Sequence, residues 1–196
     1  FQTPGPGLGE DAERYLAASH ALDHTDEAVA ALVEQAEDET ELASGPQAVG
    51  RALRDFVDDF IDSKNLAVGF ATASEVARTG EGDCTEHGCL LAAMLRGAGI
   101  PSRTVTGLVY ADQFLGGRDI FGYHMWTQAW IETAEGQGVW IDLDAAFPGQ
   151  VNGFDATHIA LSTSAQADDD FTNDMVAMLP LMQGLEVKVV ELAWEE

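Results

Sequence analysis

The sequence predicts an α+β fold, with helices in the first half of the chain and a mainly antiparallel sheet in the second. Before Pro101, apolar residues recur at the spacing of three and four that is typical of amphipathic helices. After Pro101, the chain is rich in β-branched and aromatic residues and is interrupted by glycine-containing turns. A run of helices followed by a run of strands indicates an α+β domain.

Two amphipathic helices are predicted in the first third of the chain, each with a start signal and an apolar stripe. Thr25 is a suitable N-cap for the first helix, because its side chain can accept a bond from an unpaired backbone N–H group. The apolar face of that helix consists of Val29, Leu32, Val33 and Ala36. The segment Ser44-Gly45-Pro46 opens the second helix, since proline suits the first helical turn. Its stripe consists of Val49, Leu53, Phe56, Val57, Phe60 and Ile61.

A glycine-broken loop leads from a short predicted helix at residues 74–78 into a strongly apolar helix. Gly80 and Gly82 allow backbone conformations that bulkier residues resist, and Asp83 can cap the new helix. Gly99 is placed to end it. The residues that would bury this helix recur at helical spacing, and they are Leu90, Leu91, Met94, Leu95 and Ala98.

Cys84 stands at the start of this apolar helix, where unpaired N–H groups and the helix dipole favour a thiolate over a thiol. The thiolate is the nucleophilic form, so Cys84 is the candidate nucleophile, and the alternative is a packed core cysteine. Cys89 lies five residues further along the same helix. Their Cα atoms would be about 8 Å apart, which is too far for a disulfide. Both thiols are therefore expected to be free.

The second half of the chain reads as strands joined by turns. The predicted strands cover residues 104–110, 124–133, 139–143 and 157–161. A Glu-Gly-Gln-Gly turn joins the second and third of these strands as a hairpin. Residues 111–121 are interpreted as a long connection of the kind that often carries function. Towards the C-terminus we expect a helix at about 174–182 and a last strand at 185–192.

Length and charge limit the class of protein. The 196 residues predict a single domain at 13–196 after a flexible lead at 1–12. The formal charge of −25 repels phosphates, which excludes nucleic acid as a partner. Salt should relieve the repulsion among the carboxylates of the chain itself.

No apolar run approaches the ~18 residues of a membrane span, so we expect a soluble chain. Because the chain begins without Met or a leader, we expect a piece of a longer product.

His124 and Asp144 follow Cys84 in the sequence and complete a set of thiol, imidazole and carboxylate. In such a set the thiolate attacks an amide carbonyl, the imidazole later protonates the leaving amine, and the carboxylate orients the imidazole. A hairpin brings a residue early in one strand opposite one late in the next, which fits His124 and Asp144. Asp142 lies on the same side of its strand as Asp144, so strand parity does not choose between them.

Three consecutive blocks of the sequence resemble one family. They are G-D-C-T-E-H-G-C-L-L-A-A-M-L-R-G-A-G-I-P-S-R-T-V-T-G-L-V-Y, then Y-H-M-W-T-Q-A-W-I, then V-W-I-D-L-D-A-A-F, and the later D-A-T-H-I-A-L fits with them. Together they resemble the bacterial transglutaminase-like superfamily over about residues 13–192. The resemblance implies a papain-like fold, with N-terminal helices packed on the antiparallel sheet. It also implies a triad of Cys84 from G-D-C, His124 from H-x-W and Asp144 from W-x-x-x-D-A.

From this resemblance we expect thiol-dependent acyl chemistry on amides through a cysteine thioester. The enzyme would be a protease or amidase, or a transglutaminase that transfers the acyl group to an amine, with a protein or peptide substrate and no cofactor. The alternative is a non-catalytic binding or scaffolding domain of the same fold. Where the family often has Asp-Pro-Thr or Asp-Ala-Thr, this chain has Asp144-Ala145-Ala146, which keeps the carboxylate. The backbone N–H of Cys84 is the oxyanion donor that can be named.

Metal ligation is the less favoured interpretation at two places, and we expect no metal. Cys84, His87 and Cys89 would point in differing directions from one helix, and no second Cys/His pair completes a zinc site. The run Asp168–Asp170 lacks the alternation of a calcium loop, although some animal relatives use calcium, and it is interpreted as a solvated turn. Trp126 would share a strand face with the candidate histidine and is expected to flank the site.

Overall fold

The computed structural model describes residues 5–40, 45–64, 70–114, 116–132, 137–147, 153–168, 187–188 and 190. Its helices are the 3₁₀ turn η1 (Gly9–Asp11), α1 (Ala12–Leu16), α2 (Glu27–Thr40), α3 (Pro46–Phe60), α4 (Ala73–Thr79) and α5 (Cys84–Gly97). Its strands are β1 (Gly5–Pro6), β2 (Ser63–Lys64), β3 (Glu81–Gly82), β4 (Ser102–Phe114), β5 (Gly117–Glu132), β6 (Gln137–Leu143) and β7 (His158–Ser164).

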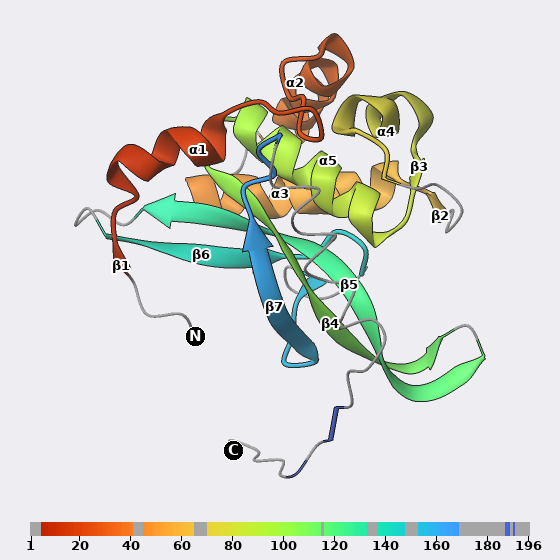
Figure 1. Cartoon of the computed structure of the whole chain (residues 1–196). Helices are drawn as coiled ribbons and strands as arrows, with labels where there is room; N and C mark the ends of the chain where they lie inside the picture. Colours follow the sequence, from red (N-terminus) through yellow and green to blue (C-terminus); the bar gives the residue numbers. More distant parts are fainter. Residues whose placement is uncertain are drawn as a thin grey trace.

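The helices lie on one side of a five-stranded sheet (Figure 1). The strand order is β1-β6-β5-β4-β7, and each neighbouring pair in this order is antiparallel. β2 and β3 form a separate parallel pair. Helices therefore come first and the antiparallel sheet follows, which confirms the predicted α+β class.

α5 is the centre of the core between the helices and the sheet. Four of the five side chains predicted to bury it, Leu90, Leu91, Met94 and Leu95, are fully buried, and they pack with Ala129 and Leu143 of the sheet. The helix ends as predicted, because Gly99 adopts a φ of 75° and the N–H of Ile100 donates to the carbonyl of Leu95 at 2.8 Å. Burial of this one helix fixes the position of its first residue, Cys84.

The start of α5 is fixed by a capping box. The side chain of Asp83 accepts the N–H of Thr85 at 2.9 Å, and Glu86 accepts the N–H of Asp83 at 2.9 Å. Glu86 is fully buried, and this burial raises its pKa. A side chain at position 82 would collide with Glu86, so Gly82 lets the loop pass close to the helix. The predicted cap is confirmed.

The N-cap predicted for α2 is wrong by one residue. The helix begins at Glu27, and the side chain of Asp26 accepts the N–H of Ala28 at 2.9 Å. Asp26 is a stronger cap than Thr25 because its carboxylate also suits the positive end of the helix dipole. It also forms an ion pair with Arg78 of α4 at 2.7 Å.

Residues 111–114 and 117–121 are not a loop, contrary to the prediction. They form the arms of a long β4–β5 hairpin, in which Tyr110 pairs with Phe121 and Gln113 pairs with Arg118. The glycines at 116 and 117 sit at the tip of this hairpin instead of in an irregular connection. The hairpin projects beyond the helical layer (Figure 1).

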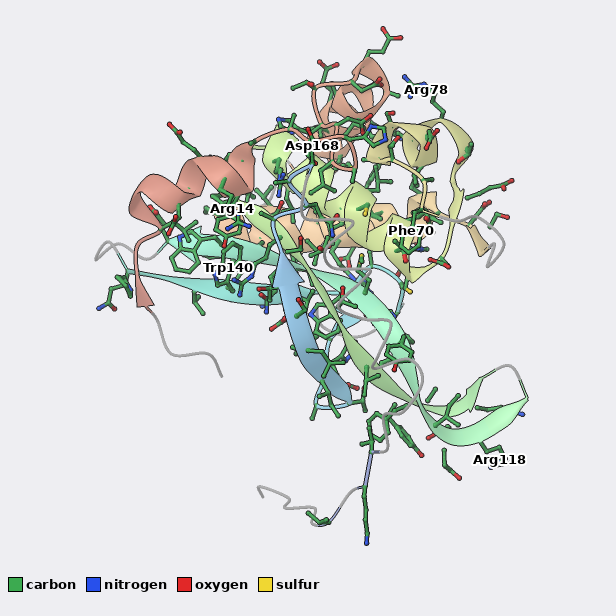
Figure 2. The ribbon with its side chains drawn as sticks, in the orientation of Figure 1. Arg14, Phe70, Arg78, Arg118, Trp140 and Asp168 are labelled. Carbon is green, nitrogen blue, oxygen red and sulfur yellow. The ribbon has the colours of Figure 1, made fainter. Side chains whose placement is uncertain are left out.

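The opposite end of the sheet is covered by α1. Tyr15 of α1 packs edge-on against Trp140 at 4.9 Å, and Arg103 lies 4.0 Å from the centre of the same indole ring. Figure 2 labels Trp140 together with Arg14 of α1. Trp130 packs against Trp140 at 5.3 Å, so these two tryptophans pack within the hairpin of β5 and β6.

Some predictions fall outside the described residues. They are the helix at 174–182, the greater part of the strand at 185–192, and Asp169 and Asp170 of the acidic run; residues 187–188 and 190, which are described, are not in a strand. Within the part of the chain that the structure describes, no helix is both long and apolar enough to span a bilayer.

Candidate active site

Cys84 is the first residue of α5, where the helix leaves its capping loop. Its side chain is partly exposed, whereas Cys89 is buried, and both thiols are free. Burial raises the pKa of Cys89 to about 12, so this thiol stays protonated at neutral pH. Of the two cysteines, Cys84 is the one that a substrate or reagent can reach.

His124 lies on β5 with its ring buried. Its Nε2 is 2.5 Å from Asp144 Oδ2. Burial alone would lower the pKa of His124, but the interactions of the ring with Asp144 and Cys84 outweigh burial and raise the pKa to about 9. The ring is therefore protonated at neutral pH.

Asp144 lies directly after β6, not opposite His124 in the ladder. Pairing between β5 and β6 stops at Thr127 and Leu143, so the cross-strand argument for the His124–Asp144 contact was wrong in its geometry. The contact forms because the chain turns after Leu143. In this turn Asp144 Oδ1 accepts the N–H of Ala146 at 2.8 Å. Burial would raise the pKa of Asp144, but hydrogen bonds from the histidines lower it.

Asp142 has other partners. Its Oδ1 accepts Trp126 Nε1–H at 2.9 Å and Gln128 Nε2–H at 2.6 Å. The carboxylate that contacts His124 is therefore Asp144, and Asp142 fixes the indole of Trp126 instead. Strand parity did not separate the two aspartates, because Asp144 lies beyond the end of the strand.

Two residues that the sequence analysis did not single out hold the Asp144 turn. Arg54 of α3 is buried, and its Nε donates to the Asp144 carbonyl at 2.7 Å. Its guanidinium also donates to the carbonyl of Phe147. Gly153 has a φ of 64°, and any side chain there would collide with the Asp144 carbonyl. Arg54 lies next to Leu53 of the apolar stripe of α3, and this position of a charged residue could have indicated that it is buried.

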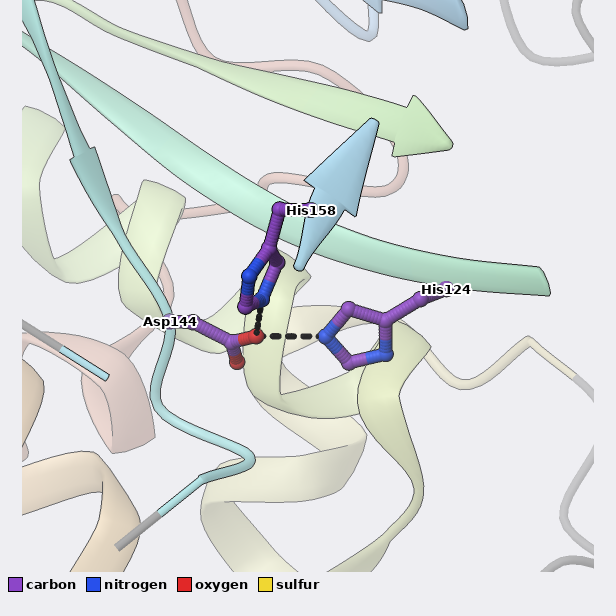
Figure 3. A group of neighbouring side chains, drawn as sticks. All are labelled: His124, Asp144 and His158. Carbon is purple, nitrogen blue, oxygen red and sulfur yellow. Dashed lines mark hydrogen bonds and ion pairs between the residues drawn. The ribbon is translucent and has the colours of Figure 1, made fainter. Parts of the chain in front are cut away.

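A second histidine contacts the same carboxylate oxygen. His158, the first residue of β7, has its Nε2 3.1 Å from Asp144 Oδ2, and Figure 3 shows both rings directed at that oxygen. His158 was not predicted to be a site residue. The sequence feature that could have indicated it is its position in D-A-T-H-I-A-L, the last stretch of the family resemblance.

Aromatic rings surround this cluster. The ring of Trp126 is stacked 6.1 Å from that of His124, which confirms that it flanks the site. Phe147 lies 5.0 Å from His124, and Phe154 lies 4.6 Å from His158. These rings bury the imidazoles and strengthen their electrostatic contacts with the carboxylate.

The zinc alternative, with Cys84, His87 and Cys89 as ligands, does not correspond to the cluster of potential ligands in the structure. Within the described residues, the group of three or more that comes close enough is His124, Asp144 and His158, whose ligand atoms lie within 4.8 Å of one another. His87 is instead buried, with its Nδ1 2.6 Å from the carbonyl of Asp83.

Comparison with known families identifies the chain. The model of the transglutaminase-like superfamily matches residues 29–145, which is more than half of the sequence. The chain belongs to this superfamily. The superfamily contains cysteine proteases and transglutaminases, and the matched range includes Cys84, His124 and Asp144. No curated protein sequence matches the chain.

Solved structures are similar in fold. A candidate cysteine protease from Cytophaga hutchinsonii is 21% identical with a TM-score of 0.60, over 81% of this chain and 48% of its own. The periplasmic domain of TgpA from Pseudomonas aeruginosa, bound to ethylmercury, is 24% identical with a TM-score of 0.48, over 70% of this chain and 49% of its own. The chain thus spans about half the length of these two proteins. The first of them supports the transglutaminase-like fold.

Proposed function

We propose that the chain is an enzyme of thiol acyl chemistry on amides, in which Cys84 is the nucleophile. The observation that carries this proposal is the bond of the buried His124 ring to Asp144, together with the raised pKa of His124, to which both Asp144 and Cys84 contribute. A protonated imidazole beside a thiol at a helix start stabilises the thiolate form by charge and by unpaired N–H groups. In this proposal His124 is the acid and base, and Asp144 orients it.

The first half of the reaction forms a thioester. The sulfur of Cys84 attacks the carbonyl carbon of an amide, and the negative charge moves to the carbonyl oxygen near the N–H of Cys84. His124 then gives its proton to the leaving nitrogen as the C–N bond breaks. An amine leaves and an acyl group stays on sulfur. Asp144 keeps the ring in the tautomer and orientation that this proton transfer needs.

The second half releases the acyl group. Water or an amine attacks the thioester carbonyl, and His124 accepts the proton that this nucleophile loses. The C–S bond breaks, and Cys84 returns as a thiolate. Attack by water completes hydrolysis, and attack by an amine completes transglutamination. Hydrolysis and transfer therefore differ only in which nucleophile reaches the thioester.

A cavity beside the start of α5 supports a peptide or protein substrate. Its volume is about 250 Å³, and its walls include Phe70, Thr85, Cys89, Gln166 and Asp168. Phe70 and Asp168 are labelled in Figure 2. This size suits one side chain rather than a whole small-molecule ligand. Thr85 directly follows the proposed nucleophile, so a side chain held in the cavity would bring its neighbouring amide close to the thiol.

The test is capture of the acyl group on the thiol. The protein is incubated with a glutamine-containing peptide, with and without a primary amine, and both the protein and the peptide are followed by mass spectrometry. We expect a mass gain on Cys84 and then peptide cleavage, deamidation or amine incorporation. Cys84→Ala should abolish these products, whereas the matched variant Cys89→Ala, which keeps the proposed nucleophile and only trims one wall of the cavity, should still form them.

Two results would contradict the proposal. One is turnover that survives Cys84→Ala, which would place the chemistry elsewhere. The other is the absence of any acylated protein or product together with equal alkylation of Cys84 and Cys89 by iodoacetamide at neutral pH. That pair of results would favour a binding or scaffolding domain.

A further inference from the structure

His158 contacts the site but has no part in the reaction proposed above. Its side chain is 3% exposed, and its Nε2 shares Asp144 Oδ2 with His124 (Figure 3). An ionised carboxylate only accepts hydrogen bonds, so both rings donate from Nε2. On its other side, His158 Nδ1 lies 3.5 Å from the backbone nitrogen and 3.3 Å from Oδ1 of Asp155.

The distances within this cluster favour hydrogen bonding over metal binding. Zinc bonds of about 2.0–2.1 Å in a tetrahedral site hold neighbouring ligand atoms about 3.3 Å apart. Asp144 Oδ2 is instead 2.5 Å from His124 Nε2 and 3.1 Å from His158 Nε2. The distance to His158 lies in the ordinary N–H···O range and the distance to His124 is shorter still, so both nitrogens are in hydrogen-bond contact with this oxygen. The cluster is therefore one carboxylate oxygen shared by two imidazole donors.

The sheet carries a specific irregularity that directs His158 to the site. The pairing of β4 with β7 shifts by one residue, which leaves Leu161 as an extra residue in a β-bulge. Beyond the bulge, His158 lies opposite Val109, whereas regular pairing would put Ile159 there. Opposed residues share a face of the sheet, so regular pairing would turn His158 to the other face.

We propose that His158 is a positioning residue, which holds the Asp144 carboxylate against His124. One carboxylate oxygen is fixed by the N–H of Ala146 at 2.8 Å, and the other by the two imidazoles. With three donors on two oxygens, the carboxylate has one orientation. Removal of His158 would leave the second oxygen with a single donor, and rotation of the group would weaken its bond to His124.

His158 also separates the carboxylate from solvent. A cavity of about 280 Å³ lies beside it, with walls that include Phe147, Asp155 and His158 itself. If the imidazole were removed, water from this cavity would reach Asp144 Oδ2 and compete with His124 for it. Hydration weakens a buried charge-assisted hydrogen bond, so proton binding by His124 would weaken as well.

The catalytic consequence of this inference rests on the proposed function, but the positioning itself can be measured without a substrate. In the wild-type protein, the ring of His124 is expected to titrate near its raised pKa of about 9. Loss of one hydrogen bond to a charged group changes an equilibrium by about 10- to 100-fold. His158→Ala should therefore weaken proton binding by His124 by at least about tenfold, which moves its midpoint towards 6.5.

The experiment is a pH titration followed by NMR on protein with ¹⁵N-labelled histidine. We compare the wild type, His158→Ala, His158→Gln and the matched control His20→Ala, which removes an exposed histidine that is not part of the cluster. The amide of glutamine can donate an N–H to Asp144, so His158→Gln should restore most of the His124 midpoint. His20→Ala should leave it unchanged. The wild-type spectrum should also show the proton of His158 on Nε2.

Two titration results would overturn the inference. If His158→Ala leaves the His124 midpoint unchanged or raises it, His158 does not anchor the carboxylate. If the Ala and Gln variants lower it equally, a space-filling role replaces hydrogen-bond donation. If the midpoints behave as expected but no thioester forms on Cys84, the proposed function fails while the positioning role stands. If a thioester forms on Cys84 but the midpoints do not shift, the positioning role fails while the proposed function stands.

Discussion

The two faces of β5 differ in how they are buried. The face towards α5 is covered by regular packing, since Ala129 is fully buried in the core and Thr127 donates to the carbonyl of Gly88 at 2.8 Å. The opposite face carries His124 and Trp126, whose indole contacts Phe154 of the segment after β6. The first face is covered by an amphipathic helix with regular apolar spacing. The second face is covered by irregular segments that are held by polar and aromatic contacts. Stability should therefore be governed mainly by one face and reactivity by the other.

The largest effect is expected from Asp144→Asn on the irregular face. Asparagine keeps the shape but loses the charge that holds the protonated ring of His124, so turnover of the glutamine peptide should fall by about 10⁴-fold. Asp142→Asn is the matched control, because it changes the same atoms two residues earlier and should reduce turnover little. Steady-state kinetics of both variants would test the assignment, and the reverse ranking would contradict it.

Arg54→Met should destabilise the fold by about 3 kcal/mol and also disturb the site. Methionine fills similar space but leaves the carbonyls of Asp144 and Phe147 without their buried donor. Urea unfolding and the NMR midpoint of His124 would be measured together. Arg51→Met on the same helix is the control, because Arg51 is exposed and its loss should leave both measurements near wild type.

Leu91→Ala tests the regular face. Leu91 is fully buried in α5, and the cavity left by its truncation should cost about 2–5 kcal/mol in urea unfolding. The titration of His124 in the folded variant should remain at its wild-type midpoint. A comparable loss of stability with a shifted His124 midpoint would mean that the two faces are not separate.

The protonation of His124 should also appear in the pH dependence of folding. Its pKa is raised from 6.5 to about 9 in the folded state, so its contribution to stability is fully present below pH 6.5 and is lost as pH rises through about 9. Between pH 7 and 10, the wild type should therefore lose more stability than His124→Gln in urea unfolding. Parallel curves for the two proteins would contradict the shifted pKa.

The smallest effect is expected from salt. The formal charge of −25 makes the carboxylates repel one another, and added NaCl screens this repulsion. The midpoint of thermal unfolding should therefore rise by a few degrees across a salt series. A midpoint that stays flat or falls would mean that favourable ion pairs, such as Asp26 with Arg78, outweigh the net repulsion.

The packing of α5 on β5 was predictable, because apolar residues recur in the sequence of α5 at helical spacing. The spacing of Leu90, Leu91 and Met94 predicted the buried side of α5, and Asp83 predicted its start. Only the outer part of the β4–β5 hairpin, at residues 111–121, was interpreted as a loop, because the glycines near its tip outweighed the strand signals on either side. Local sequence predicted where the elements lie better than how far the strands extend.

The irregular face was only partly predictable. Cys84 and His124 followed from their residue types and element starts, but the preference for Asp144 over Asp142 came from the family resemblance. The roles of Arg54 and His158 depend on a turn beyond β6 and on a one-residue bulge in β7. Neither the turn nor the bulge leaves a periodic pattern in the sequence. The sequence alone therefore does not indicate which polar side chains come into contact.

The bond between Arg54 and Asp144 has a consequence for the order of folding. It joins residues 90 positions apart, whereas the contacts within α3 and α5 are local. Contacts between distant positions carry the larger entropic cost of loop closure and tend to form later than local helices. Half-folded chains would then contain α5 with its thiol before His124 and Asp144 have assembled. During synthesis, such a chain would carry the Cys84 thiol at its helix start without the imidazole, and Cys84, His124 and Asp144 would come together only when folding is complete.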